Sequence, residues 1–233
     1  MKFGSAMLAT LAVAATAAQA ATTDLVVHCD PPLAGPLRDI AVVFYAKSNV
    51  RLRIFPTAPN AIPAQLAREI QNDVIVTQPE VLARVGAAGQ LTDFPPSARW
   101  RNRLVIGTRR EGRPRPIEQA VCAAPDPGWG GGPDGPALLA AAGVRPGRLL
   151  GTFDTDEART LLLAGEVEYA LLHASELTPE LAPSAAPGLT VELLAIAAVT
   201  RSTRRPNPEA LLRFLATEQA AAVLRAAGLE PVT

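Results

Sequence analysis

The sequence predicts an α/β fold in two lobes, and three observations lead to this prediction. Short apolar runs of strand type alternate with segments of helical periodicity from residue 25 to 85, and a second such alternation runs from 120 to 176. Between the two sets lies a basic segment broken by glycine and proline, residues 109–116, which we interpret as a hinge crossing. Alternation at this spacing is typical of parallel strands joined by right-handed crossovers. We therefore expect each lobe to hold a mixed or parallel sheet flanked by helices.

The first set of elements follows from hydrophobic spacing. Leu37, Ile40 and Phe44 recur at helical spacing, whereas the run at 50–55 alternates apolar residues with arginines, as a half-buried strand does. In chain order the expected elements are strand 25–29, helix 37–48, strand 50–55, helix 64–70, strand 74–77 and helix 79–85. In such sheets ligands bind beyond the carboxyl ends of the strands. The loops at these ends are residues 30–36, 56–63 and 78.

The second set repeats the pattern and ends in a polar tip. An acidic first turn precedes the apolar side of a helix that begins near Thr155, and Gly165-Glu166 forms a tight turn into a buried strand that ends at His173. The expected elements are strand 102–108, strand 120–124, glycine loop 126–135, helix 136–142, strand 149–153, a helix from 155, strand 169–173, an apolar run at 189–200 and helix 207–229.

The apolar run at 189–200 is longer than a typical strand, so we expect it to cross back from the second lobe to the first. This gives lobe I residues 21–104 plus 197–233, and lobe II residues 105–196.

The amino terminus has the pattern of a cleavable signal peptide. Lys2 is followed by a run of Ala, Leu and Val at residues 6–17 and then by Ala18-Gln19-Ala20, a small-x-small cleavage site. The run is too short to span a bilayer. We therefore expect residues 1–20 to be removed and the mature protein to be exported to the periplasm.

Charge and motifs exclude several classes of function. The number of Lys and Arg residues equals the number of Asp and Glu residues, 22 each. The chain therefore has no net positive charge that would favour binding to nucleic acid. The sequence has no GxSxG or HExxH motif, and Ser175-Glu176 beside His173 has no spacing suited to a catalytic triad. We predict a binding protein with no enzymatic activity and no cofactor.

The cysteines leave two alternatives open. Cys29 and Cys122 allow one disulfide bridge in an oxidising compartment, or they are two free, buried thiols. A copper-type site from both thiols with His28 and His173 is a further alternative, since copper favours thiolate and imidazole ligands. No CxxC, HxxxH or methionine cluster supports that site, so we predict no metal centre.

Several segments, taken in order, carry a resemblance to a known family. They are Pro32-Leu33 with Leu37, Asp39 and Ile40, LAREI at 66–70 followed by NDVIVT, NRLV at 102–105, DPGWGGG at 126–132, AGEVEYALLHASE at 164–176 and LLRFLATEQAAAVLRAAGL at 211–229. By their order and spacing the chain resembles the two-lobed periplasmic solute-binding proteins of ABC importers, which have the class II periplasmic binding fold. Among these it is most similar to the molybdate-binding proteins, over essentially the whole mature chain.

The resemblance implies a ligand, a partner and a set of binding positions. It implies a monomer that captures a small oxyanion between its lobes and presents it to an ABC permease in the membrane. It implies no binding of nucleic acid. Members of that family hold the dianion with hydroxyl and backbone N–H donors from both lobes. Carried over position by position, these donors fall at Pro32, within residues 60–63, at Gly131 and Gly132, at Thr155 and at His173.

Pro32 departs from the family pattern, because proline offers a dianion neither a hydroxyl nor an N–H group. Each donor lost from a buried charged group costs about 1.5–3 kcal/mol, which argues against molybdate itself. Asn60 or Thr57, together with a protonated His173, are candidate replacement donors. The alternative function is that of an exported accessory protein that binds a protein partner through a degenerate cleft and transports no small molecule.

Overall fold

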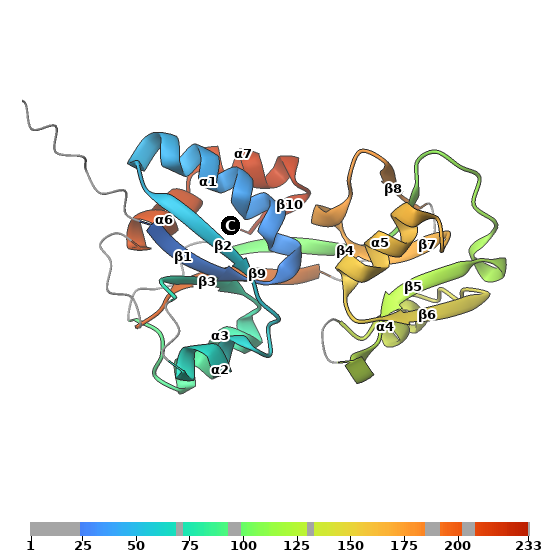
Figure 1. Cartoon of the computed structure of the whole chain (residues 1–233), viewed down its shortest axis with the longest axis horizontal. Coiled ribbons are helices and arrows are strands. Elements are labelled where there is room, and N and C mark those ends of the chain that lie inside the picture. Colours follow the sequence, from blue (N-terminus) through green and yellow to red (C-terminus); the bar gives the residue numbers. More distant parts are fainter. Residues whose placement is uncertain are drawn as a thin grey trace, which may run out of the picture.

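The computed structural model describes residues 24–68, 72–92, 99–129, 133–184, 192–201 and 208–232. Within these ranges the chain forms two halves, and one long strand reaches from the first half into the second (Figure 1). Each half is a mixed sheet flanked by helices, so the predicted α/β fold class is confirmed. The predicted signal peptide, residues 1–20, lies outside the described residues. No helix in the described ranges is long and apolar enough to cross a membrane.

The first sheet begins with the three parallel strands that the sequence predicts. β1 pairs in parallel with β2 and with β3, and β9 joins antiparallel between β3 and β4. Its strands are β1 (Asp24–Cys29), β2 (Arg51–Pro56), β3 (Val74–Thr77), β9 (Glu192–Val199), the first part of β4 (Arg99–Arg109) and β10 (Leu229–Pro231). The carboxyl ends of β1, β2 and β3 therefore meet at one edge of the sheet.

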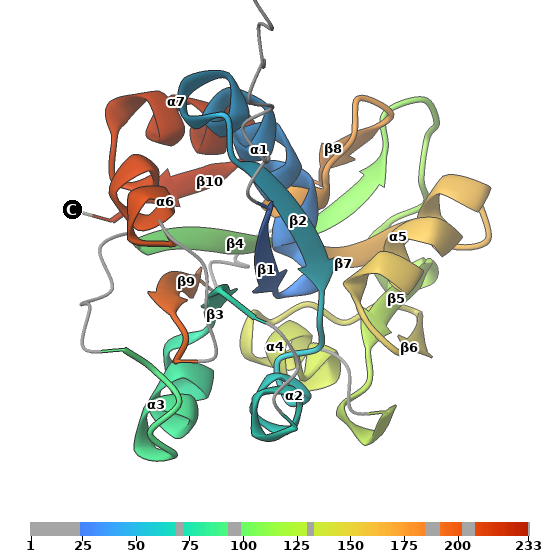
Figure 2. The same ribbon diagram turned by 60° about the vertical axis from the view of Figure 1, so that its left-hand side comes forward.

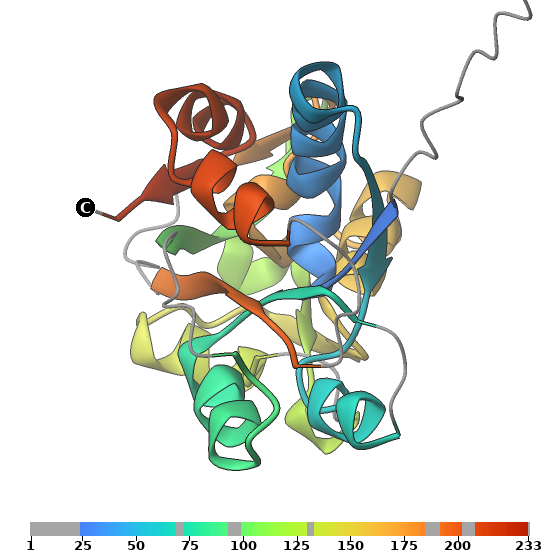
Figure 3. The ribbon, with the colours of Figure 1, turned by 90° about the vertical axis from the view of Figure 1, so that its left-hand side faces the viewer.

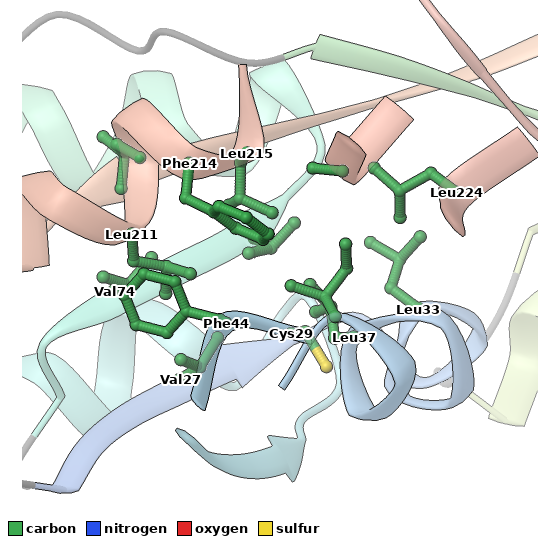
Figure 4. Close-up of a cluster of buried hydrophobic side chains, with 14 of the residues drawn as sticks. Val27, Cys29, Leu33, Leu37, Phe44, Val74, Leu211, Phe214, Leu215 and Leu224 are labelled. Atoms are coloured by element: carbon green, nitrogen blue, oxygen red, sulfur yellow. The ribbon is translucent and has the colours of Figure 1, made fainter. Parts of the chain in front are cut away.

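Helices cover both faces of the first sheet (Figure 3). On one face lie α1 (Ala34–Ser48), α6 (Pro208–Leu215) and α7 (Glu218–Ala226), and on the other lie α2 (Ile62–Ala67) and α3 (Pro79–Ala87). The main core forms under the first group, where the rings of Phe44 and Phe214 lie 5.3 Å apart (Figure 4). Because side chains alternate along β1, Cys29 points into this core and His28 to the other face.

The second sheet is smaller and also has a helix on each face. Its strands are β5 (Val121–Pro125), β6 (Arg148–Thr152), β7 (Tyr169–His173), β8 (Leu181–Pro183) and the second part of β4. α5 (Thr155–Ala164) packs on the side of Ala170 and Leu172, and α4 (Gly135–Ala141) packs on the side of Tyr169 and Leu171. Because β5, β6 and β7 are parallel, their carboxyl ends also meet at one edge.

β4 itself carries the chain from one half to the other. Residues 99–103 of this strand pair with β9 in the first sheet, and residues 104–109 pair with β7 and β8 in the second. The interpretation of residues 109–116 as the hinge crossing is therefore wrong. That segment follows the far end of β4, where Arg110 binds the carbonyl oxygens of Pro179 and Leu181 and Arg115 binds Glu168.

The carboxyl-terminal segment also differs from its prediction as one helix over 207–229. It forms α6 and α7, followed by the short strand β10, which lies between α7 and β4 (Figure 2). The break occurs because Thr217 takes an extended conformation and its hydroxyl accepts a hydrogen bond from the N–H of Ala220, which starts α7. Gly228, at a φ of 82°, turns the chain into β10.

The disulfide alternative is wrong and the alternative of two free thiols is confirmed. Cys29 lies in the main core of the first half, and Cys122 lies in the core of the second half under α4. Burial raises the pKa of each thiol to about 12, so both are protonated at neutral pH.

Candidate functional site

The candidate site is formed by the segments that follow the parallel strands of both halves. After β1 comes a short 3-10 helix, η1 (Pro31–Leu33), and after β7 comes another, η4 (Ala174–Glu176). These two segments contact each other, and η1 also contacts α5, so the strand ends of the two halves meet here.

A hydrogen-bonded bridge joins the halves at this point. The hydroxyl of Ser175 donates to the carbonyl oxygen of Pro32 at 3.0 Å, and it accepts a hydrogen bond from Nδ2 of Asn102 at 2.8 Å. Asn102 is buried on β4, close to the point where that strand passes between the sheets. Pro32 therefore contributes an acceptor to a contact between the halves.

Glu176 is a buried carboxyl that accepts hydrogen bonds from two neighbours. Its Oε1 accepts from the hydroxyl of Thr155 at 2.8 Å, and its Oε2 accepts from the backbone N–H of His173 at 2.7 Å. Thr155 is the first residue of α5, which starts there because Asp154 caps the helix by accepting from the N–H of Glu157. Burial raises the pKa of Glu176 to about 7, although both hydrogen bonds oppose this shift.

His173 ends β7 as predicted, and its imidazole is almost fully buried. Only 6% of the residue is exposed, and His173 is the N-cap residue of η4. Burial lowers the pKa of the imidazole to about 4, so the ring is neutral at physiological pH. This neutral state opposes a protonated His173 as a donor to an anion, a role that stays a prediction.

Asp30 is a second buried carboxyl at the strand ends. It follows β1 directly, and its Oδ1 accepts a hydrogen bond from the hydroxyl of Thr77 at the end of β3, at 2.5 Å. The backbone of Gln78 binds it as well, but burial outweighs both contacts and raises its pKa to about 7. The rule that singles out His173, a polar residue at the carboxyl end of a buried strand, also applies to Asp30, which is therefore recognisable from the sequence by the same signal.

Thr57 and Asn60 lie on the loop after β2. The hydroxyl of Thr57 is buried 2.8 Å from Nδ1 of His28 and also contacts the carbonyl oxygen of Phe55, whose ring stacks on His28. Asn60 is exposed in the turn that leads to α2. The described contacts join Pro32, Thr155 and His173 into one network through Ser175 and Glu176. Gly131 and Gly132 lie outside the described residues.

The described residues do not include a metal centre of the usual kind. No three or more His, Cys, Asp or Glu side chains within the described ranges lie close enough together to hold a metal ion. The chemistry that this arrangement offers is hydrogen bonding and charge, supplied by two buried carboxyls and one imidazole.

Comparisons with known proteins relate this architecture to binding proteins. A family model described as bacterial extracellular solute-binding protein matches residues 25–230. No curated protein sequence matches the chain.

Three solved structures share the fold at low sequence identity. The periplasmic molybdate-binding protein of Azotobacter vinelandii has a TM-score of 0.69 at 15% identity, with 90% of this chain and 99% of that chain covered. The sulfate-binding protein SubI of Mycobacterium tuberculosis has a TM-score of 0.69 at 16% identity, with coverage of 90% and 87%. The iron-bound protein HitA of Pseudomonas aeruginosa has a TM-score of 0.55 at 16% identity, with coverage of 87% and 84%.

Proposed function

Because the chain belongs to the family of bacterial extracellular solute-binding proteins, we propose that it captures a small solute in the periplasm and delivers it to an ABC-type permease. The family is not enzymatic, so the chain binds its solute without changing it. We propose that the mature protein begins at Ala21, after removal of residues 1–20, and acts as a monomer.

The observation that carries this proposal is the meeting of the two sets of strand ends. Segments η1 and η4 come from different halves, and the hydroxyl of Ser175 reaches the carbonyl oxygen of Pro32 across the junction. We propose lobe boundaries at 104/105, within β4, and at 196/197, although the pairing of residues 192–196 with residues 99–103 extends the first sheet back to residue 192. Movement about these strands would open and close the contact around a solute and give the permease a distinct closed form.

Structural relatives bind solutes of different charge. The names of three of them refer to molybdate, sulfate and iron. A small oxyanion is therefore one candidate class, with Pro32, Thr57, Asn60, Gly131, Gly132, Thr155 and His173 as its proposed contacts.

A protein-binding role is the second candidate, and one observation favours it. Pro32 has no N–H group, and the hydroxyls of Thr57 and Thr155 make hydrogen bonds within the protein. An oxyanion would have to replace these contacts, whereas an accessory protein that binds a protein partner would not need the donors.

A thermal-shift screen of the mature chain separates the two candidates. A solute present at a hundred times its dissociation constant stabilises the folded protein by about 2.7 kcal/mol, which is a measurable rise in Tm. The probes are molybdate, tungstate, sulfate, phosphate, Cu²⁺ and Zn²⁺, together with a series of amino acids and amines. A saturable shift with any of them supports solute capture, and no shift with the full set favours the partner protein.

A further inference from the structure

Segment η4 belongs to the second half of the molecule, yet separate segments of the first half hold it in place. It directly follows β7, whose last residue, His173, pairs with Leu104 of β4. From there η4 contacts η1, the first part of β4 and the turn between α7 and β10. All three contacted segments belong to the first half, so η4 fastens the halves to each other in addition to the strands that cross between them.

A directed chain of hydrogen bonds runs from Asn102 through Ser175 to Pro32. Nδ2 of Asn102 donates to the hydroxyl oxygen of Ser175 at 2.8 Å, and this hydroxyl donates to the carbonyl oxygen of Pro32 at 3.0 Å. An amide NH2 group only donates and a serine hydroxyl has one proton, so the contact with Asn102 leaves that proton for Pro32. Oδ1 of Asn102 also accepts from the backbone N–H of Ser175 at 3.4 Å. The buried Asn102 therefore orients the hydroxyl that reaches the other half.

Gly228 places the carboxyl-terminal turn directly against η4. β10 begins opposite Asn102 and β7 ends opposite Leu104, so the two strands approach each other along β4. A Cβ atom added at Gly228 would lie 3.0 Å from the carbonyl oxygen of Ala174 and 3.1 Å from its carbonyl carbon. Contacts this short require the backbone of η4 to move. Glycine at this position therefore lets η4 pack closely against the first half.

The two bonds of Ser175 respond differently to movement between the halves. Asn102 lies two residues before Leu104, where β4 begins to pair with the second half, so rotation about β4 displaces it little from Ser175. Pro32 is on η1, which is part of neither strand that crosses between the halves, so the same rotation separates it from Ser175. The bond between Ser175 and Pro32 therefore has to break before the halves move apart.

We propose that Ser175, oriented by Asn102 and with η4 packed against Gly228, forms a latch that holds the two halves closed when no solute is bound. Asn102 is the positioning residue of this latch. A solute enters only after the bond between Ser175 and Pro32 has broken, and the bond forms again on closure. One hydrogen bond of ordinary strength changes the ratio of closed to open molecules about fivefold. The latch goes beyond the proposed function, since it acts without solute and does not depend on the identity of the solute.

Distances between spin labels on the two halves test the latch in the mature chain without added solute. The labels are attached at Ala67→Cys in α2 and Ala140→Cys in α4, which are exposed positions on the first and the second half (Figure 1). The native thiols of Cys29 and Cys122 are buried, so they stay unlabelled. Double electron–electron resonance then reports how far apart the halves are.

The expected result is one main distance in the otherwise unchanged protein. In Ser175→Ala and Asn102→Ala we expect a second population at a longer distance, with the ratio of closed to open molecules lowered about fivefold because one hydrogen bond is lost. Ser175→Thr keeps the hydroxyl and should restore the single distance, and Thr160→Ala removes an exposed hydroxyl of the same half without effect. Circular dichroism checks that each variant is folded, and if Asn102→Ala fails to fold, Ser175→Ala still tests the latch.

A matched pair of glycine variants tests the packing against η4. Gly228 and Gly89 each follow a helix at a positive φ, 82° and 68°, so replacement by alanine strains both backbones in the same way. Nothing lies within 4 Å of a Cβ atom at Gly89, whereas one at Gly228 meets Ala174. We expect Gly228→Ala to populate the longer distance and Gly89→Ala to keep the closed one.

Three outcomes would overturn the latch. The first is a protein that is mostly open before any latch residue is changed. The second is a distance distribution that stays the same in Ser175→Ala and Asn102→Ala. The third is equal opening in Gly228→Ala and Gly89→Ala, which would assign the effect to backbone strain. None of these outcomes touches the proposed function, because the thermal-shift screen measures solute capture separately.

Discussion

The hydroxyl of Thr155, at the start of α5, donates a hydrogen bond at 2.8 Å to Oε1 of Glu176, in the segment that follows β7. Thr155 is at the helix start, where a backbone amide end attracts negative charge. In this chain the carboxyl of Glu176 lies beside the helix start, where it accepts from the Thr155 hydroxyl and from the N–H of His173. Burial raises the pKa of this carboxyl to about 7, so it is partly protonated at neutral pH.

The pKa of Glu176 makes stability depend on pH in a predictable direction. Burial raises this pKa from 4.5 to about 7, so the folded form binds the proton more tightly than the unfolded form. The wild type should therefore lose stability as pH rises from about 4.5 to about 7, by roughly 3 kcal/mol from this group. Glu176→Gln lacks this loss, so its stability relative to the wild type should rise across the same window.

Urea denaturation of both proteins at pH 5, 6, 7 and 8 measures this difference, and Glu118→Gln serves as the exposed control. Parallel curves for wild type and Glu176→Gln would show that Glu176 titrates normally and is not buried as described.

The bridge through Ser175 should contribute measurably to stability. Asn102→Ala removes a buried partner of the Ser175 hydroxyl, and we expect a loss of about 1–3 kcal/mol, whereas Ser175→Ala should cost about 1 kcal/mol. Chemical denaturation of the two single variants and the double variant gives the coupling free energy between positions 102 and 175. The exposed Thr160→Ala, whose hydroxyl binds only its own helix, is the control. Additive effects at the two positions would contradict a shared bridge.

The two histidines of the chain should both resist protonation. Burial lowers the pKa of His173 to about 4 and also lowers that of His28. In an NMR titration we expect the ring signals of His173 to keep their neutral shift down to near pH 4, with His173→Gln to assign them. A midpoint near 6.5 would mean that the imidazole is open to water.

Both thiols should be present and unreactive in the folded protein. Cys29 and Cys122 are buried in separate cores, and each has its pKa raised to about 12. A thiol reagent should label neither residue at pH 8 in native buffer and both in denaturant without reductant. Labelling of neither in denaturant would reveal a disulfide and contradict the fold.

The sequence predicted those helices and strands whose start and end are marked by residues close to them in the chain. The strand Tyr169–His173 has the predicted bounds, because a tight turn at Gly165 and a polar end at His173 delimit a short apolar run. By contrast, the helical spacing of apolar residues continues across Ala216 and Thr217, so the sequence did not predict the break between α6 and α7. The double pairing of β4 was missed because each half of the strand finds its partners far away in the sequence.

The site was predictable only in outline. The rule that ligand-binding residues lie at the carboxyl ends of buried strands identified His173. The same rule, applied to every strand, identifies Asp30 as well. It gave no indication that Asp30 and Glu176 are buried, since burial depends on how η1 and η4 meet across the halves. The resemblance to molybdate-binding proteins directed attention to donors, whereas the hydroxyls of Thr155 and Ser175 at the junction donate within the protein, to Glu176 and Pro32.

The most direct test of this account is a crystal structure of the mature protein grown with a solute that raises its Tm in the thermal-shift screen. We predict density for that solute between the two halves, at the strand ends that the contact between Ser175 and Pro32 joins. A structure in which the solute lies elsewhere, or in which this junction is empty at a concentration that saturates binding in solution, would contradict it.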